Sequence, residues 1–504
     1  MDQMLKRALN ARVTEVLPAP TPLQDAPLLS QRLGLSVSIK REDLTPVFSF
    51  KLRGAYNRIA HLPDSELGRG VIAASAGNHA QGVAFACRRR GARCRIVMPR
   101  TTPDIKIAAV RGYGAEIDLV GDNYSDAAAY AGELVESAGL TMIHPFDDLD
   151  VIAGQATIGL EILRQAPREL GAIFVPIGGG GLISGVAAVI KELRPEVRVI
   201  GVQPEESPAM ARSVALGERV RLDHVSIFAD GVAVRQVGEL TLALCRRYVD
   251  DIILVSEDEL CAAIQDAFQE TRTLLEPAGA LSIAGLKRYA GRAGVASERA
   301  HVVIASGANI SLSRLGYIAE RAEVGEEREA LFAVTIPEQP GAFLSFCAAL
   351  GQRSVTEFNY RLSSRAHAHV FIGVRIAGAR GAREVADELA TAGYTVSDLT
   401  HDELAKTHVR HMVGGLGQGV LDEVLYTFEF PERPGALLEF LTSLGGRWNI
   451  SLFHYRNHGA GFGRVLCGFE VPPAQRPAFE AALDALGFEH LAVGDSPVTR
   501  FLMG

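Results

Sequence analysis

The chain has 504 residues, roughly three to four times the size of a usual single domain, so two or more domains are expected. Hydrophobic residues make up 48% of the sequence and charged residues 22%, which excludes a mainly disordered or fibrous chain. The formal net charge of -8 comes from 51 basic and 59 acidic side chains spread along the whole length. This acidic balance argues against nucleic acid as a partner.

The distribution of cysteines and apolar runs predicts a cytoplasmic protein without a membrane anchor. Six cysteines lie far apart with no C-x-x-C pair, which favours reduced thiols over disulfides or a zinc site. The first sixteen residues carry five charged side chains and no apolar core of a secretory signal. The uncharged run from Leu170 to Ile190 is long enough to span a membrane. It contains Pro176 and four glycines, so a buried strand, loop and helix is the better interpretation.

From residue 37 to residue 309, short apolar runs typical of strands alternate with longer helical segments. The predicted strands are Val37 to Lys40, Val71 to Ala74, Arg95 to Met98, Glu116 to Val120, Ala172 to Ile177, Val197 to Val202 and His301 to Ala305. Helix start and stop signals lie between them, at Thr102-Pro103, at Ser125 and Gly139, and in a capping box from Ser256 to Glu259. This alternation predicts open parallel sheets covered on both faces, with ligands bound beyond the carboxyl ends of the strands.

After a charged segment at 319–330, the sequence repeats itself. Residues 331–346 read LFAVTIPEQPGAFLSF, and residues 425–440 read LYTFEFPERPGALLEF. The pattern of each copy predicts a small βαββαβ unit, and the glycine-rich stretch 414–419 predicts a linker between the copies. We therefore expect a large domain over 1–320, two small domains over 330–402 and 423–495, and a linker over 403–422.

The first candidate motif reads S-F-K-L-R-G and occupies residues 49–54. Arginine supplies 44 of the 51 basic side chains, so a lysine at this place is of interest. A lysine amine forms Schiff bases, whereas a guanidinium does not. The alternative is that Lys51 is one more exposed charge at the start of a helix.

The second candidate motif reads S-A-G-N-H-A-Q-G, at residues 75–82, and lies between a strand and a helix. Small residues there leave backbone N–H groups bare at a helix N-terminus, which suits a carboxylate or a phosphate. An ordinary strand-to-helix turn would have the same composition.

The third motif is Gly178-Gly179-Gly180-Gly181-Leu182, directly after a predicted strand. The spacing of a dinucleotide fingerprint fails because Ile and Ser follow, and a P-loop fails because no G-K-S/T closes the loop. A lone phosphate held by backbone N–H groups fits better.

The fourth motif is Ser306-Gly307-Ala308-Asn309, where a polar side chain at a strand end faces the ligand crevice, with a plain turn as the alternative.

Together these four segments resemble the fold-type II pyridoxal phosphate enzymes, and among them the biosynthetic threonine dehydratases. The lysine motif, the S-x-G-N-H-x-Q-G loop and the tetraglycine loop occur in the order and approximate spacing of that family. The repeated tail resembles its paired ACT-like regulatory domains, including the P-E-x-P-G-A turn. The resemblance implies an α/β catalytic domain with two open parallel-sheet subdomains, like the β subunit of tryptophan synthase, followed by two α+β ACT-like domains.

The resemblance also implies roles for individual residues. Lys51 would form the Schiff base with the aldehyde of pyridoxal 5'-phosphate, and Phe50 would pack beside the pyridine ring. Asn78 would bond the ring hydroxyl, and Ser306 would meet the pyridine nitrogen. The phosphate would bind to Gly178, Gly179, Gly180, Gly181 and Leu182. The substrate carboxylate would bind to the N–H groups of Ser75, Ala76, Gly77, Asn78 and His79.

The activity implied is elimination of water and ammonia from L-threonine, the committed step of isoleucine biosynthesis. The tail would sense isoleucine, with valine as an opposing ligand, in a homotetramer; Tyr360 and Tyr455 are candidate effector-site residues, with packing between the copies as the alternative. A serine dehydratase or racemase would share the catalytic motifs, and a sensor without turnover is a more remote alternative. Asp230 and Glu276 lie in stretches typical of the family but receive no role, and no metal site is predicted, although a metal near Asp230 stays open.

Overall fold

The computed structural model describes residues 3–503 with the exception of 293–297, 338–341, 352, 354, 363–366, 412–421, 432–439, 441–446 and 457–461. Two compact units make up the chain, Met1–Leu312 and Ser313–Gly504. The predicted boundary at residue 320 falls inside α14 (Leu315–Gly325), the first helix of the second unit. Among the described residues, no helix combines the length and the apolar character needed to cross a membrane.

The first unit contains thirteen α-helices within its described residues. They are α1 (Gln3–Leu9), α2 (Pro27–Leu33), α3 (Lys51–Ala60), α4 (Asp64–Arg69), α5 (Asn78–Arg90), α6 (Asp104–Gly112), α7 (Tyr124–Ala138), α8 (Leu149–Gln165), α9 (Gly181–Leu193), α10 (Ala209–Leu216), α11 (Glu239–Tyr248), α12 (Glu257–Thr271) and α13 (Pro277–Ala290). The capping box at Ser256 and Glu259 is confirmed, and Gly139 ends α7 in the left-handed conformation. The predicted start of α7 at Ser125 is wrong, because the Asn123 side chain accepts the N–H groups that need a cap.

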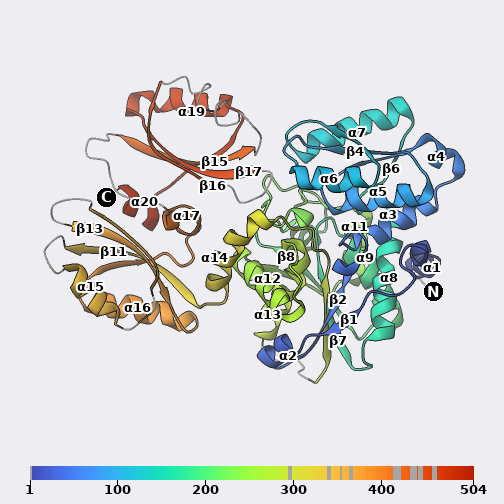
Figure 1. Ribbon diagram of the computed structural model, residues 1–504, viewed down its shortest axis with the longest axis horizontal. Helices are drawn as coiled ribbons and strands as arrows, with labels where there is room; N and C mark the ends of the chain where they lie inside the picture. The colour runs from blue at the N-terminus through green and yellow to red at the C-terminus, as the bar shows by residue number, and fades with distance from the viewer. Residues whose placement is uncertain are drawn as a thin grey trace. The chain divides into compact units, whose positions relative to one another are not determined.

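The larger sheet of the first unit has six strands in the order β1-β2-β10-β7-β8-β9. Their bounds are β1 (Leu23–Asp25), β2 (Ser36–Arg41), β7 (Leu170–Pro176), β8 (Arg198–Pro204), β9 (Asp251–Val255) and β10 (Ala300–Ala305). Every pair is parallel except the edge pair β1 and β2. Figure 1 shows α12 and α13 on one face and α8 and α9 on the other. With both faces covered, the central strands are continuous apolar runs.

The smaller sheet has four parallel strands in the order β5-β4-β3-β6. Their bounds are β3 (Val71–Ala74), β4 (Cys94–Met98), β5 (Glu116–Leu119) and β6 (Thr141–Met142). Alternate residues of β3 face opposite cores: Val71 packs with residues of α3 and α5, and Ile72 packs with residues of α7. In Figure 1, α7 lies on one side of this sheet and α5 and α6 lie on the other. The predicted pair of open parallel sheets is confirmed.

The second unit contains two antiparallel sheets with matching strand orders, β12-β13-β11-β14 and β16-β17-β15-β18. The first copy consists of β11 (Glu329–Pro337), α15 (Ala342–Leu350), β12 (Val355–Leu362), β13 (His367–Arg375), α16 (Ala379–Thr391) and β14 (Thr395–Asp398). The second contains β15 (Glu423–Pro431), β16 (Asn449–Arg456), β17 (Phe462–Glu470), α19 (Arg476–Ala485) and β18 (Glu489–Ala492). The βαββαβ pattern is confirmed for the first copy, whereas the first helix predicted in the second copy lies outside the described residues.

The predicted linker over 403–422 is wrong in its first half. Residues 403–411 form α17 (Glu403–Thr407) and the short helix η5 (Val409–His411). Ala405 and Val409 belong to a core that also contains Leu331 of the first copy and Leu425 of the second. Figure 1 shows α17 and α20 (Pro497–Met503) between the two sheets. This segment therefore fills the space between the copies, while the glycine-rich stretch 414–419 lies outside the described residues.

Candidate active site

Lys51 is the first residue of α3, and its amine lies among the ends of several elements. Nζ donates a hydrogen bond to the carbonyl oxygen of Pro145 at 3.0 Å and lies 5.3 Å from the centroid of the Phe50 ring. Burial lowers the pKa of the amine to about 8, and the negative charge of Glu276 opposes that shift. An appreciable share of this amine is therefore neutral near physiological pH, and the neutral form is the nucleophile and the base.

The loop that carries Lys51 pairs with the loop that follows β10. The N–H of Phe50 donates to the carbonyl of Ser306 at 3.1 Å, and the N–H of Ala308 donates to the carbonyl of Phe48 at 2.9 Å. The Ser306 side chain is buried, and its hydroxyl donates to the carbonyl of Ala278 at 3.1 Å. Two motifs far apart in the sequence are thus held together by backbone hydrogen bonds.

The glycine loop joins β7 to α9, and its glycines are required because other side chains do not fit. A Cβ at Gly179 would lie 2.2 Å from the ring of Phe146, and one at Gly180 would lie 2.5 Å from Cε of Met210. Gly180 also has a φ of +98°. The N–H groups of residues 178–182 have no acceptor among the described residues, and they lie at the N-terminus of a 13-residue helix. Such a group of free donors suits a phosphate.

The loop at 75–79 joins β3 to α5 and offers fewer donors than predicted. The N–H of Ser75 donates to the carbonyl of Val97 at 3.0 Å, which continues the sheet. The prediction that this N–H binds the substrate is therefore wrong, because the sheet already uses it. The N–H of Gly77 donates to the Ser75 hydroxyl at 3.3 Å. The N–H groups of Ala76 and of the first two residues of α5 have no acceptor within the described residues.

The His79 side chain is uncharged and holds two segments of this site together. Its ring is buried, and Nε2 donates to the carbonyl of Ile143 at 2.8 Å. Burial lowers the pKa of this imidazole to about 3, and the charge of Lys51 acts in the same direction. Because the ring stays neutral, His79 anchors the chain at Ile143 and does not supply a proton.

Two residues to which the sequence assigned no role meet at Asn78. Asn78 Nδ2 donates to Glu276 Oε1 at 2.5 Å, and Asn309 Nδ2 donates to Asn78 Oδ1 at 2.7 Å. Glu276 is the residue before α13, but its side chain does not cap that helix; its buried carboxylate turns to Asn78 instead. The sequence analysis named Glu276 only because its stretch, L-E-P-A-G, is typical of the family.

The segment 143–147 was missed by the sequence analysis, although it contacts most of the site. Pro145 receives the hydrogen bond of Lys51, and Phe146 covers the glycine loop. The Asp147 carboxylate accepts from the first N–H groups of α11, at residues 239–241, with distances of 2.9 to 3.2 Å. Its signal is the pair of polar residues His144 and Asp147 just after a short strand, where ligand-binding residues gather in parallel sheets.

Of the remaining candidates, Asp230 directly precedes residues that lie against the glycine loop, and the two tyrosine side chains are outside the described residues. Asp230 forms an ion pair with Lys106 at 2.5 Å. No group of three or more possible metal ligands exists in the described part of the chain. The backbones of Tyr360 and Tyr455 lie in β12 and β16, but their side chains are not among the described ones, so their proposed roles stay predictions.

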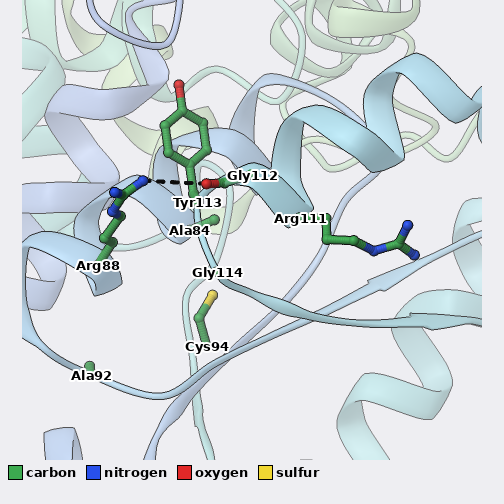
Figure 2. A pocket seen from close by; sticks show the side chains of 8 residues that line it. All are labelled: Ala84, Arg88, Ala92, Cys94, Arg111, Gly112, Tyr113 and Gly114. Carbon is green, nitrogen blue, oxygen red and sulfur yellow. Dashed lines mark hydrogen bonds between the residues drawn. The ribbon is translucent and has the colours of Figure 1, made fainter.

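A separate cavity of about 460 Å³ opens between α5 and α6 (Figure 2). Its lining contains none of the predicted site residues and consists of Ala84, Arg88, Ala92, Cys94, Arg111, Gly112, Tyr113 and Gly114. Arg88 donates to the carbonyl of Gly112 at 3.3 Å, and Figure 2 shows the Arg111 side chain pointing away from Arg88. Because the two guanidinium groups do not converge, this cavity does not form an anion site.

The residues around Lys51 fit pyridoxal 5'-phosphate. An amine of lowered pKa suits the aldehyde, and the free N–H groups of residues 178–182 suit the phosphate. The Asn78 amide lies next to the segment that carries the Ser306 hydroxyl, since a Cβ at Gly307 would be 3.2 Å from Asn78 Nδ2. The fold and this set of groups define a pyridoxal phosphate enzyme, in agreement with the match of residues 15–307 to the family described as pyridoxal-phosphate dependent enzyme.

Comparison with known proteins identifies the particular family. Residues 320–409 and 415–503 match the C-terminal regulatory domain of threonine dehydratase. The chain is 54% identical over 502 residues to the biosynthetic L-threonine dehydratase of Burkholderia multivorans, covering 99% of both chains, and 50% identical to that of Escherichia coli, covering 99% of this chain and 97% of the other. The solved threonine deaminase isoform 2 of Solanum lycopersicum superposes with a TM-score of 0.62 at 48% identity, covering 64% of this chain and 88% of that one. This chain belongs to the biosynthetic threonine dehydratase family.

Proposed function

We propose that the protein eliminates water from L-threonine to release an enamine, whose hydrolysis gives 2-oxobutanoate and ammonia, the committed step of isoleucine biosynthesis. The observation that carries the proposal is the Lys51 amine, whose pKa is lowered to about 8 beside a loop of free N–H groups. Relatives that share half of the residues over almost the whole chain carry the name of this enzyme, which supports the choice of substrate.

Lys51 is the base of the proposed reaction. Bound pyridoxal phosphate supplies an electron sink next to the bond between the substrate Cα and its hydrogen. Lys51 Nζ takes that proton, since an amine with a pKa of about 8 is neutral often enough to accept one. The carbonyl of Pro145, 3.0 Å from Nζ, orients the amine.

Other groups of the chain hold the cofactor and the substrate. Residues 178–182 bind the phosphate, Asn78 binds the ring hydroxyl, Phe50 lies against the ring, and the N–H groups of Ala76, Asn78 and His79 bind the substrate carboxylate. The neutral hydroxyl of Ser306 would exchange its hydrogen bond to the Ala278 carbonyl for one to the pyridine nitrogen. A neutral hydroxyl does not force protonation of that nitrogen as a carboxylate would, which favours loss of the β-hydroxyl over transamination.

The test is an assay of 2-oxo acid release from L-threonine and from L-serine. We expect 2-oxobutanoate and ammonia in equal amounts from threonine. Interconversion of serine enantiomers without release of a 2-oxo acid would favour a racemase, and cofactor binding without turnover would favour a sensor.

We further propose that the second unit binds isoleucine as an inhibitor and valine as an opposing ligand, and that the protein is a cytoplasmic homotetramer. The match to a regulatory domain and the paired βαββαβ units support this role. Such control requires two global states that bind isoleucine with different affinity. A coupling of about 1 to 3 kcal/mol would change the apparent threonine affinity by roughly 5- to 150-fold. Tyr360 and Tyr455 remain our effector-site candidates.

Truncation tests the regulatory proposal, and the structure indicates where to cut. A cut after Glu320 would divide α14, in which Tyr317 and Ile318 are buried, so the chain should end at Leu312. The remaining unit should keep activity and lose its response to isoleucine. If the soluble truncated protein were still inhibited by isoleucine, the effector site would lie in the first unit.

A further inference from the structure

A chain of hydrogen bonds crosses the cofactor site from Val47 to Glu276. Asn309 Nδ2 donates to the carbonyl of Val47 at 2.9 Å and to Asn78 Oδ1 at 2.7 Å. Asn78 Nδ2 then donates to Glu276 Oε1 at 2.5 Å. The four residues come from four separate segments of the sequence, so this series of hydrogen bonds exists only in the folded protein.

The two ends of this chain fix its direction, because neither end can donate. A backbone carbonyl accepts only, so the nitrogen of the Asn309 amide faces Val47, and its second hydrogen points to Asn78. An ionised carboxylate also accepts only, so the nitrogen of the Asn78 amide faces Glu276. The oxygen of Asn78 and one of its hydrogens are thus both engaged. Its second N–H is the donor left for a ligand.

We propose that Glu276 and Asn309 are positioning residues that turn the Asn78 amide so that its N–H, and not its oxygen, meets the ring hydroxyl oxygen of bound pyridoxal phosphate. A donor at this place stabilises the deprotonated oxygen of the ring, whereas an acceptor would favour the protonated form. The proposal rests on the role proposed for Asn78.

The decisive variant is Asn309→Asp, which keeps the shape of the side chain and removes its donors. Asn78 would then lie between two carboxylates and donate to both, which leaves its oxygen for the cofactor. We expect the absorbance of the bound cofactor, at fixed pH, to shift toward the shorter-wavelength band of the protonated ring hydroxyl. Titration of the cofactor-free protein should show affinity about 10- to 100-fold weaker than that of the parent, as for loss of a hydrogen bond to a charged group.

Four further variants distinguish a changed orientation of the Asn78 amide from a general loss of structure at the site. Asn78→Ala and Glu276→Ala should shift the absorbance in the same way. Glu276→Gln should keep the parent spectrum, because the amide oxygen of the glutamine still accepts from Asn78. Thr45→Val removes a buried hydroxyl that donates to the Ser49 carbonyl at 2.8 Å and does not touch Asn78, so the spectrum should not change.

The outcomes distinguish the two proposals. If Asn78→Ala shifts the absorbance but Asn309→Asp and Glu276→Ala leave it like that of the parent, the positioning role is overturned and the role of Asn78 survives. If Asn78→Ala also leaves the spectrum unchanged, the amide does not meet the ring hydroxyl, and both proposals fail.

Discussion

Two lysines of the first unit, the fully buried Lys40 and the partly buried Lys51, differ in the partners of their amines. Lys40 is fully buried, and its Nζ donates to the Thr21 carbonyl at 2.7 Å, to Glu161 at 2.6 Å and to Gln165 at 2.8 Å. Lys51 Nζ donates to the Pro145 carbonyl. Burial lowers the pKa of both amines, but carboxylates bonded to or near Lys40 favour its charged form. The partners of the two amines therefore separate a lysine of an ion network from the lysine that we propose to react.

The neighbouring Arg53 fixes the start of α3 through ion pairs that do not involve the amine of Lys51. Arg53, two residues further along α3, is completely buried and donates to both Glu42 and Glu161. Together with Lys40 these residues form a buried ion network that ties α3 to β2 and α8. The network fixes the start of α3 through Arg53, so the amine of Lys51 needs no carboxylate of its own.

The largest expected effect is loss of turnover on removal of the reactive amine. Lys51→Ala and Lys51→Arg should each reduce 2-oxo acid formation by several orders of magnitude, on the order of 10⁴ or more, because neither side chain can bond the aldehyde. Circular dichroism of both variants should resemble that of the parent, which shows that the fold is intact. Activity above about 1% in either variant would remove Lys51 from the chemistry.

The next largest effect is on folding and comes from the ion network. Arg53→Met leaves the buried Glu42 carboxylate without its cation and Glu161 with Lys40 alone, so the free energy of unfolding should fall by about 3 to 5 kcal/mol in urea titrations. Arg58→Met is the matched control on the same helix, because Arg58 pairs with Asp148 and Asp150 near the surface. That substitution should cost about 1 kcal/mol or less. Equal losses in the two variants would contradict the structural role of the network.

Substitution in the glycine loop should damage folding as well as cofactor binding. Gly180→Ala introduces a Cβ at a positive φ and within 2.5 Å of Met210, so the free energy of unfolding should fall by about 2 to 4 kcal/mol even without cofactor. Gly77→Ala is the control, because an added Cβ there meets no atom within 4 Å. Unfolding titrations of both cofactor-free variants measure the difference. Full stability of Gly180→Ala would show that this loop adopts another conformation in the free protein.

A smaller effect depends on pH and concerns the charge of Lys51 itself. The folded-state pKa of about 8 lies below the ordinary value of 10.5, so the unfolded chain binds more protons between these values. The cost of the buried charge is therefore fully present below pH 8 and is relieved as pH rises through that window. In the cofactor-free protein, Lys51→Met should raise the free energy of unfolding by about 1 to 3 kcal/mol at pH 7 and by much less near pH 10. A gain that does not change with pH would contradict the lowered pKa.

Local signals predicted much of the fold, and they failed where structure depends on distant residues. The run from Leu170 to Ile190 divides into β7 and α9 as expected, because Pro176 and the glycines mark the break within the sequence itself. The strands β1 and β6 were missed because three and two residues show no periodicity. In contrast, β9 has a local signal in its apolar run from Ile252 to Val255 that our prediction did not use.

Of the candidate site, too, local signals predicted one part and missed the part that depends on distant residues. Lys51, the glycine loop and Asn78 stand out through spacing and composition, whereas the roles of Glu276 and Asn309 become visible only where separate loops converge. The Ser75 N–H was assigned wrongly because a sequence does not show how far a strand extends its pairing.

The central claim is that Lys51, of seven lysines in the chain, is the one whose amine bonds the cofactor. Reduction of the cofactor-loaded protein with borohydride, followed by proteolysis and mass spectrometry, tests it directly. We predict that the added mass of the reduced cofactor lies on the peptide that contains Lys51 and that the Lys40 peptide stays unmodified. Attachment at Lys40 or at any other lysine, with Lys51 unmodified, would contradict the account.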